Sequence, residues 1–447
     1  MAHWLHCLME MQRRLTSRTY LPMLAATLLL SSIGDAQEQA PLTRAEVIAQ
    51  ARERNLELKA ARERLGIQEA ELAQASRLLP SNPELEANVG GDQFLANEGE
   101  RRLGIGIKQE FEIAGQRGLR KAQATAQLKE AQARWASLET QVARDASSAF
   151  LRLWRAEQLR TLAREALELN VTLEKAAESR FQAGDISELD RNVVAVDVAR
   201  AQREVSTAET ELVQAQVELA RLVGLPSGTH VAIADLSPAT PVVGTLEEFK
   251  ARAREHRADL AAARFVQEAT KAQLRLRYRE RIPNPTLRLG YDKDRLRVSG
   301  PLPSGGPDIA LGDVSSTISA SISIPLPVWD RQQGPIRAAQ AEEAAAATER
   351  DAAERLVDTE VEAAFSATER SRQALDAVTA ALPKVDRNLE LIRKGFEAGQ
   401  VDLLELLTTR DRSQRARQEY VEARMEYVRA LDELMRATGQ LPMEARQ

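Results

Sequence analysis

Side chains that could catalyse a reaction or bind a metal ion are few in this chain of 447 residues. The single cysteine is Cys7, and two of the four histidines also lie before residue 37. The other two, His230 and His256, lack the short spacing typical of metal ligands, so we expect both to be surface residues. The three methionines after residue 36 complete no site of soft ligands. This inventory predicts no enzyme, no metal site and no cofactor.

Residues 1–36 have the pattern of a secretory signal peptide. Three arginines precede the short apolar run 21–33, and Gly34-Asp35-Ala36 supplies a cleavage site between small residues. The alternative, an N-terminal membrane helix, would need about 20 apolar residues. Cleavage after Ala36 would remove the cysteine. Loss of the three arginines and two acids in this segment would change the net charge from −5 to −6, which argues against a nucleic-acid partner.

The rest of the sequence contains an internal duplication. The segment 180–190, which includes Gly184, returns 215 residues later around Gly399. Earlier segments repeat with an offset of 202, so the second copy has an insertion of 13 residues. The insertion falls near 299–312, which is rich in Gly and Pro, and we expect a loop there. A repeat of this size predicts two copies of one structural unit.

Each copy contains a pattern of long helices. The segment 119–182 has neither Pro nor Gly, which predicts a helix of about 95 Å, and a return helix is predicted over 187–223. Gly184 and Gly399 interrupt the pattern, which favours antiparallel hairpins over the alternative of a fibrous coiled coil. Apolar residues at 4-3 spacing predict coiled-coil seams. They are Ala201, Val205, Ala208, Leu212, Ala215, Leu219 and Leu222 in the first copy, and Ala416, Tyr420, Ala423, Tyr427, Ala430, Leu434 and Ala437 in the second.

A shorter helix precedes each long hairpin. Thr43 with Glu46, and Thr245 with Glu248, match the capping box, in which each side chain accepts a hydrogen bond from the other residue's backbone. The pattern predicts helices over about 43–79 and 246–281.

Four segments between the short and long helices alternate apolar and polar residues, which predicts strands with two unlike faces. Such strands fit either a half-buried soluble sheet or a membrane barrel wall, apolar toward lipid and polar toward a lumen. The apolar positions are Leu85, Ala87 and Val89; Leu103, Ile105 and Ile107; Leu287, Leu289 and Tyr291; and Ile318, Ala320, Ile322 and Ile324.

Four strands are too few for a membrane barrel, since such barrels begin at about eight strands. An open sheet edge is not tolerated in lipid either. A membrane-spanning sheet would therefore require an oligomer. On this arithmetic alone, two, three or four copies could close a barrel of about eight, twelve or sixteen strands.

The duplicated unit, the two glycine tips and the strand pairs resemble the TolC-like outer-membrane efflux channel family. The resemblance covers about residues 41–442, and the segments 109–117 and 324–334 resemble its cobalt–zinc–cadmium branch. It implies a mainly α-helical protein with a membrane β-barrel part. Duplicated long helical hairpins would form a periplasmic tunnel, and a homotrimer would complete a twelve-stranded barrel.

The same resemblance implies a location and partners. The protein would lie in contact with lipid in the cell outer membrane, with a large periplasmic part. It would dock on a periplasmic adaptor (membrane fusion) protein and passively export substrate from an inner-membrane pump of the resistance-nodulation-division type. The branch implies divalent heavy-metal cations as cargo, with organic compounds as the alternative. If the cargo is a metal ion, its selection would belong to the pump, because the chain has no chelating set of residues.

By resemblance, the hairpin tips would be the surface that docks on the adaptor. A simpler interpretation stays open, because glycine supplies the positive φ that a reversal between helices requires. Short polar side chains after it, such as Asp185, Ser187 and Asp402, can cap the returning helix. The tip residues are Gly184, Asp185, Ser187, Gly399, Gln400 and Asp402.

Asp190 and Glu405 lie six residues beyond the two tip glycines. By resemblance they would repeat by symmetry into a ring of carboxylates at the periplasmic entrance, which would concentrate cations there. The alternative is a solvated helix face.

The predicted organisation is a signal peptide (1–36), a first efflux repeat (37–225), a linker (226–244), a second efflux repeat (245–442) and a short tail (443–447). Two other classes of protein fit the sequence less well. A periplasmic adaptor normally has one helical hairpin flanked by β domains. A soluble coiled-coil scaffold would leave the four strands and the signal peptide unexplained.

Overall fold

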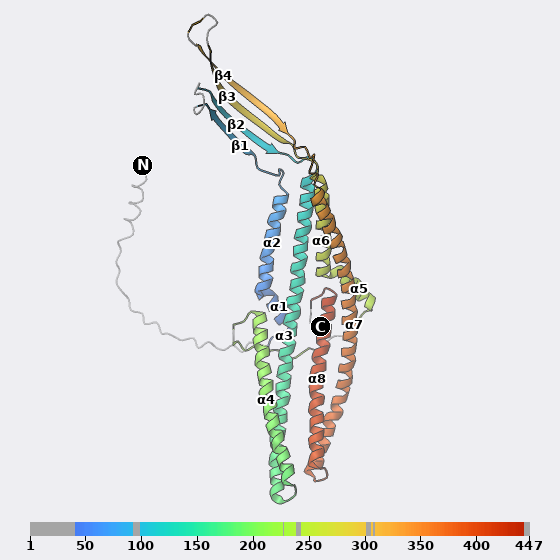
Figure 1. Ribbon diagram of the computed structural model, residues 1–447. Coiled ribbons are helices and arrows are strands. Elements are labelled where there is room, and N and C mark those ends of the chain that lie inside the picture. The colour runs from blue at the N-terminus through green and yellow to red at the C-terminus, as the bar shows by residue number, and fades with distance from the viewer. Residues whose placement is uncertain are drawn as a thin grey trace, which may run out of the picture. The chain divides into compact units, whose positions relative to one another are not determined.

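The computed structural model describes residues 41–92, 99–226, 228–237, 243–300, 305–306 and 309–441. The predicted signal peptide and the C-terminal tail lie outside these residues. The part of the chain from residue 41 onward forms one compact unit. Within it, two long helical hairpins lie side by side, and a four-stranded sheet lies at the end opposite the hairpin tips (Figure 1).

The first hairpin consists of α3 (Gln116–Ala183) and α4 (Glu188–Val223), and the second of α7 (Gln333–Glu397) and α8 (Leu403–Ala437). The 68 residues of α3 form one uninterrupted helix, about 100 Å long at 1.5 Å per residue. The prediction of long antiparallel hairpins is therefore confirmed. No helix among the described residues is both long enough and apolar enough to cross a membrane.

The two short helices are each divided in two, so the prediction of continuous helices was wrong. The first consists of α1 (Arg44–Arg54) and α2 (Leu56–Ala75), and the second of α5 (Leu246–His256) and α6 (Ala258–Arg279). Asn55 leaves the helical conformation, and its side chain accepts a hydrogen bond from the backbone of Leu58 at 2.9 Å. The interruption thus begins a new helix with its own cap.

Both predicted capping boxes are present. The carboxylate of Glu46 accepts a hydrogen bond from the backbone N–H of Thr43 at 2.8 Å, and Thr43 Oγ1 accepts one from the N–H of Glu46. The backbone hydrogen bond from Thr43 lowers the pKa of Glu46. Thr245 and Glu248 form the same pair of bonds at the start of α5.

The seam predicted on α4 is buried from Ala201 to Leu219, but the seam predicted on α8 is only partly correct. On α8 the described seam residues that are fully buried are Tyr427, Leu434 and Ala437. A second buried stripe contains Val421, Val428 and Leu431. The physical reason is that α8 packs against two helices, α7 and α3, and each contact needs its own stripe.

The largest core cluster lies where α1, α3, α4 and α8 meet, and it includes a segment predicted as a linker. Val231 and Leu236 are buried in this cluster beside Trp154. The backbone of Leu42 also pairs with this segment, donating to Ala232 O at 2.9 Å. The described part of the linker is therefore packed onto the first hairpin. His230, within it, is exposed as predicted, and so is His256.

The sheet consists of β1 (Glu84–Gly91), β2 (Arg101–Glu110), β3 (Thr286–Gly300) and β4 (Ile309–Ser323), antiparallel and in that order. The four predicted strands are confirmed. β3 and β4 extend into the insertion near 299–312, so part of the predicted loop is strand. In the chain β1 and β4 each have one unpaired edge.

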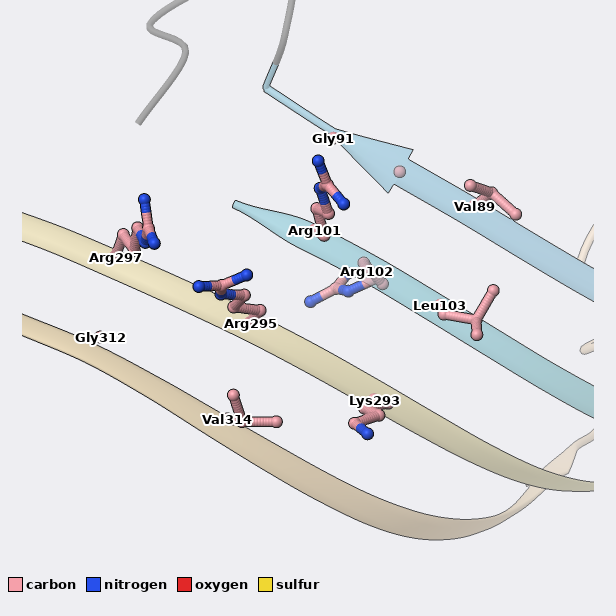
Figure 2. Close-up of a pocket in the computed structure, with 11 residues that line it drawn as sticks. Val89, Gly91, Arg101, Arg102, Leu103, Lys293, Arg295, Arg297, Gly312 and Val314 are labelled. Carbon is pink, nitrogen blue, oxygen red and sulfur yellow. The ribbon is translucent and has the colours of Figure 1, made fainter. Parts of the chain in front are cut away.

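The register separates the strand residues into two faces. The polar sheet face carries Glu86, Arg288 and Asp292, with Gly104 and Gly290 between them, and a Cβ at Gly104 would collide with the Asp292 carboxylate. The apolar sheet face carries the apolar positions predicted in the strands, and most of these side chains are exposed. The exception is Ile324, which lies just beyond the end of β4. Figure 2 shows the end of this face remote from the helices, where several basic side chains gather.

Candidate functional site at the hairpin tips

The first tip reverses the chain between α3 and α4. Gly184 has φ 85°, in the left-handed region, as the sequence predicted. Its N–H donates to Phe181 O at 3.0 Å, and the N–H of Asp185 donates to Arg180 O at 2.9 Å. This is the Schellman pattern, in which glycine lets the free carbonyls at a helix end find donors.

The second tip repeats this turn between α7 and α8. Gly399 has φ 72°, and the N–H of Gln400 donates to Gly395 O at 2.9 Å. Asp402 caps α8 by accepting a hydrogen bond from the backbone of Glu405 at 2.7 Å. The predicted capping role is confirmed for Asp402 and, at the first tip, for Ser187. Asp185 instead takes part in the turn through its backbone.

The two tips lie at the same end of the hairpins (Figure 1) and share an apolar core. Arg180 connects them, since its guanidinium lies 4.3 Å from the ring centroid of Phe396 and donates to Phe396 O at 2.9 Å. The side chains of Asp185, Ser187, Gln400 and Asp402 are exposed around this core. The buried residues of the tip core are Leu173, Ala177, Val194, Phe396, Leu406 and Leu407.

The two predicted entrance carboxylates differ in their surroundings. Asp190 is half-buried, and its carboxylate accepts hydrogen bonds from Ser187 N at 3.1 Å and Ser187 Oγ at 2.7 Å. It thus completes a third capping box. The carboxylate of Glu405 is exposed and makes no hydrogen bond or ion pair with a described residue. Of the two, Glu405 is the one whose charge is open to solvent.

Sequence reasoning missed a series of arginines on α8 that faces the first hairpin. Arg410, Arg417 and Arg424 are spaced seven apart, and we call them the arginine ladder. Arg410 is almost fully buried, with an exposed side-chain fraction of 8%. Its guanidinium bonds the side chain of Asn170 on α3 and lies 3.3 Å from the carboxylate of Asp197 on α4. The ladder thus begins with a charged contact between the two hairpins.

The other two arginines of the ladder extend this contact along α8. Arg417 lies 2.9 Å from Asp386 on α7 and 3.3 Å from Glu165 on α3. Arg424 lies over the ring of Trp154 at 5.1 Å and 3.4 Å from Asp235. Recurrence of arginine every seven residues, in phase with Leu431, was the sequence signal that could have revealed this stripe.

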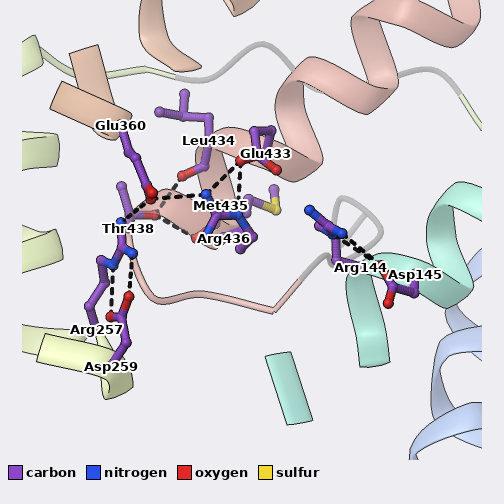
Figure 3. Close-up of polar contacts among 10 residues, drawn as sticks. All are labelled: Arg144, Asp145, Arg257, Asp259, Glu360, Glu433, Leu434, Met435, Arg436 and Thr438. Carbon is purple, nitrogen blue, oxygen red and sulfur yellow. Dashed lines mark hydrogen bonds and ion pairs between the residues drawn. The ribbon is translucent and has the colours of Figure 1, made fainter. Parts of the chain in front are cut away.

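A second polar cluster holds the break between α5 and α6 (Figure 3). Arg257 is buried and forms ion pairs with Asp259 and, at 2.6 Å, with Glu360 on α7. Glu360 also lies 3.0 Å from Arg436 on α8. Burial favours the neutral form of Glu360, but the hydrogen bonds from Arg257 and Arg436 outweigh it and lower its pKa. This cluster connects three helices and exposes no reactive group.

The described residues contain no group of three or more His, Cys, Asp or Glu side chains placed to hold a metal ion.

A sequence profile of the outer membrane efflux protein family matches residues 47–225 and 251–440. These segments make up most of the chain, and the protein belongs to this family. Its members are outer-membrane channels of tripartite efflux systems, not enzymes, which agrees with the expectation from the residue inventory.

Particular relatives extend this likeness over nearly the whole chain. The chain is 25% identical over 388 residues to the cobalt-zinc-cadmium resistance protein CzcC of Cupriavidus metallidurans, covering 85% of this chain and 86% of that protein. It is similar to the outer-membrane channel OprN, with a TM-score of 0.71, 20% identity and coverage of 88% and 89% of the two chains. For VceC of Vibrio cholerae the TM-score is 0.69 at 18% identity, with coverage of 88% and 95%. The predicted fold class is confirmed.

Proposed function

We propose that this protein is the outer-membrane channel through which a tripartite efflux system exports divalent heavy-metal cations. The observation that supports divalent metal cations as the cargo is the similarity to CzcC along 85% of the chain. The channel would be a passive conduit joined to a periplasmic adaptor and an inner-membrane pump. Selection of the metal would belong to the pump.

Growth of a strain that lacks the gene tests the cargo. We expect several-fold lower tolerance to one or more of cobalt, zinc, cadmium, nickel and copper, and unchanged tolerance to a panel of drugs and detergents. A plasmid copy of the gene should restore growth. Sensitivity to the organic compounds alone would contradict the metal cargo and favour the multidrug alternative with the same fold.

We infer a homotrimer from the sheet. Each chain supplies four strands and two unpaired strand edges, and its exposed apolar face would be unfavourable in water. Three copies would pair all edges in a barrel of about twelve strands, which is the way a membrane accommodates a sheet. A monomeric mass in mild detergent would contradict this.

The tips are proposed as the surface that docks on the adaptor, because their exposed residues cap and turn the helices while leaving side chains free for a partner. Crosslinking tests this cleanly, since the chain after residue 36 has no cysteine. Gln400→Cys should crosslink to the adaptor, whereas Gln214→Cys, exposed far along α4, should not. Equal crosslinking from both positions would argue against tip docking.

At the entrance, the proposed carboxylate ring depends mainly on Glu405, because Asp190 is engaged in its capping box. Replacing Glu405 by Gln should lower the permeability ratio of cations to anions in planar bilayers by roughly twofold, since a ring of charge sets the local ion concentration. Glu63→Gln, the same charge change at an exposed position on α2, is the control. Unchanged selectivity in Glu405→Gln would dismiss the ring.

A further inference from the structure

The charged residues of the sheet are segregated between its two faces. By the register of the four strands, the charged strand residues on the apolar sheet face are all basic. They are Arg101, Lys293, Arg295 and Arg297, which we call the basic rim. The acidic strand residues are all on the polar sheet face: Glu84, Glu86, Glu110, Asp292, Asp294 and Asp313.

Basic residues on the polar face are neutralised within the sheet. Arg102 lies 2.7 Å from Asp294, Arg288 lies 2.7 Å from Glu86, and Lys108 lies 3.2 Å from Glu84. The basic rim is different, since its side chains are exposed and none forms a salt bridge with a described carboxylate.

The rim also contains a direct opposition of like charges. Arg101 on β2 stands opposite Arg295 on β3 in the register, an arrangement that destabilises a sheet. Neither arginine forms a salt bridge with a described carboxylate that would offset this repulsion. An anion from outside the chain would remove it.

The position of the rim along the strands indicates where that anion comes from. Lys293 and Arg297 lie seven and eleven residues beyond Thr286, where β3 leaves the helical part. At about 3.3 Å per residue and a strand tilt of about 40°, Lys293 and Arg297 stand roughly 18 and 28 Å from Thr286 along the membrane normal. A membrane barrel presents an apolar band of about 25 Å to hydrocarbon. If the band starts at Thr286, the rim spans the boundary between acyl chains and headgroups, with Lys293 on the acyl side and Arg297 on the headgroup side.

The surface between the rim and the apolar band is hollowed. A depression of about 990 Å³ is lined by the rim together with Val89, Leu103 and Val314, and also by Arg102, which pairs with Asp294 (Figure 2). Its basic side can bind a phosphate, for which guanidinium groups are well suited. Its apolar side can take the start of an acyl chain. Free phosphate would use only the first of these, so the combination fits a phosphorylated lipid.

We propose that the basic rim binds the phosphate groups of outer-leaflet lipid, the lipid A part of lipopolysaccharide. This inference rests on the proposed function, because the channel's insertion in the outer membrane places the rim at the outer leaflet. Bound lipid would neutralise the rim and hold the sheet at a defined depth in the membrane.

Binding of lipid A to the purified full-length protein in mild detergent, measured by native mass spectrometry, tests the proposal. In the variant R101Q/R295Q/R297Q we expect affinity to fall on the order of 100-fold at low salt, because each basic residue near an anionic lipid contributes roughly fivefold. R288Q, the same change on the polar face and outside the depression, should bind as the unchanged protein does. R101K/R295K/R297K should retain most of the affinity, which separates charge from folding.

Two further binding measurements identify the ligand. Dephosphorylated lipid A should bind the unchanged protein as weakly as lipid A binds the triple glutamine variant, and millimolar inorganic phosphate should not displace lipid A. Equal binding of lipid A to the unchanged protein and the triple glutamine variant would overturn the proposal, and so would displacement by inorganic phosphate. Conductance of the same preparations in planar bilayers separates the lipid-site hypothesis from the proposed channel function. A protein that conducts without rim-dependent binding overturns the lipid site alone, whereas one that does not conduct overturns the proposed channel.

Discussion

Replacing Arg410 by Met is expected to raise the open fraction of the channel roughly 30- to 100-fold. Arg410 is the most buried member of the arginine ladder, and it holds α8 to Asn170 on α3 and Asp197 on α4. Removing one partner of a buried ion pair costs up to about 3–5 kcal/mol. We propose that this contact favours the closed arrangement of the hairpins, and a shift of about 2.0–2.7 kcal/mol toward the open arrangement corresponds to the stated factor.

The measurement is single-channel conductance and open probability in planar bilayers. Arg412→Met is the matched control, since Arg412 is exposed on the same helix and forms no ion pair with a described residue. A double variant, Arg410→Met with Asp197→Leu, should open little more than the single one, because both changes break one contact. Open probability unchanged by Arg410→Met would show that the ladder does not hold the hairpins closed.

Replacing Trp154 by Ala is expected to lower the free energy of unfolding by about 3–5 kcal/mol, the usual cost of removing a large aromatic side chain from a core. Trp154 is 2% exposed in the main cluster. Its Nε1 donates to Asp235 Oδ1 at 2.6 Å, and the ring lies against Arg424 of the ladder. Urea unfolding in detergent, followed by circular dichroism, would measure the loss.

Trp154→Phe is a more conservative second variant, because it keeps a buried aromatic ring while removing the indole N–H and its hydrogen bond, and the lost hydrogen bond should cost about 1–2 kcal/mol. Burial favours the neutral form of Asp235, but the hydrogen bond from Trp154 and the charge of Arg424 outweigh burial and lower the pKa of Asp235 below its ordinary value. A carboxyl whose pKa is lowered by folding stabilises the fold fully when the pH is above the pKa of the unfolded chain. This contribution is lost as the pH falls through the lowered pKa of the folded protein. The acid-induced loss should therefore be smaller in Trp154→Phe. Equal stability of Trp154→Ala and the unchanged protein would contradict the core assignment.

The elements that the sequence predicted correctly are those whose signal is local. An unbroken run without Gly or Pro predicted α3, alternation predicted four strands, and the positive φ at Gly184 and Gly399 followed from a reversal between helices. The breaks at Asn55 and Arg257 were missed. The capping hydrogen bond of Asn55 and the ion pairs of Arg257 to Glu360 depend on geometry that residue type alone does not report.

For the candidate site, the sequence located the tip turns and two of their caps but not the arginine ladder. A seam pattern detects apolar contact with one partner helix, and α8 has two partners. Arg410 looks like a surface residue in the sequence, because a buried arginine is tolerated only when carboxylates or amides from other elements reach it. Asn170 and Asp197 lie more than 200 residues away in the chain.

The sequence by itself therefore determined the duplicated hairpins, the alternating strands and the glycine tips, because each follows from backbone preference and side-chain period within a short segment. Asp190 is engaged in a capping box with Ser187, a local contact that the sequence analysis missed. Only the tertiary structure decided that Glu405 is open to solvent. It also decided that the hairpins meet through arginines, and that the four basic residues of the rim share one face of the sheet. The reason is physical, because the charge state and reach of a polar side chain depend on neighbours that folding brings together from distant parts of the chain.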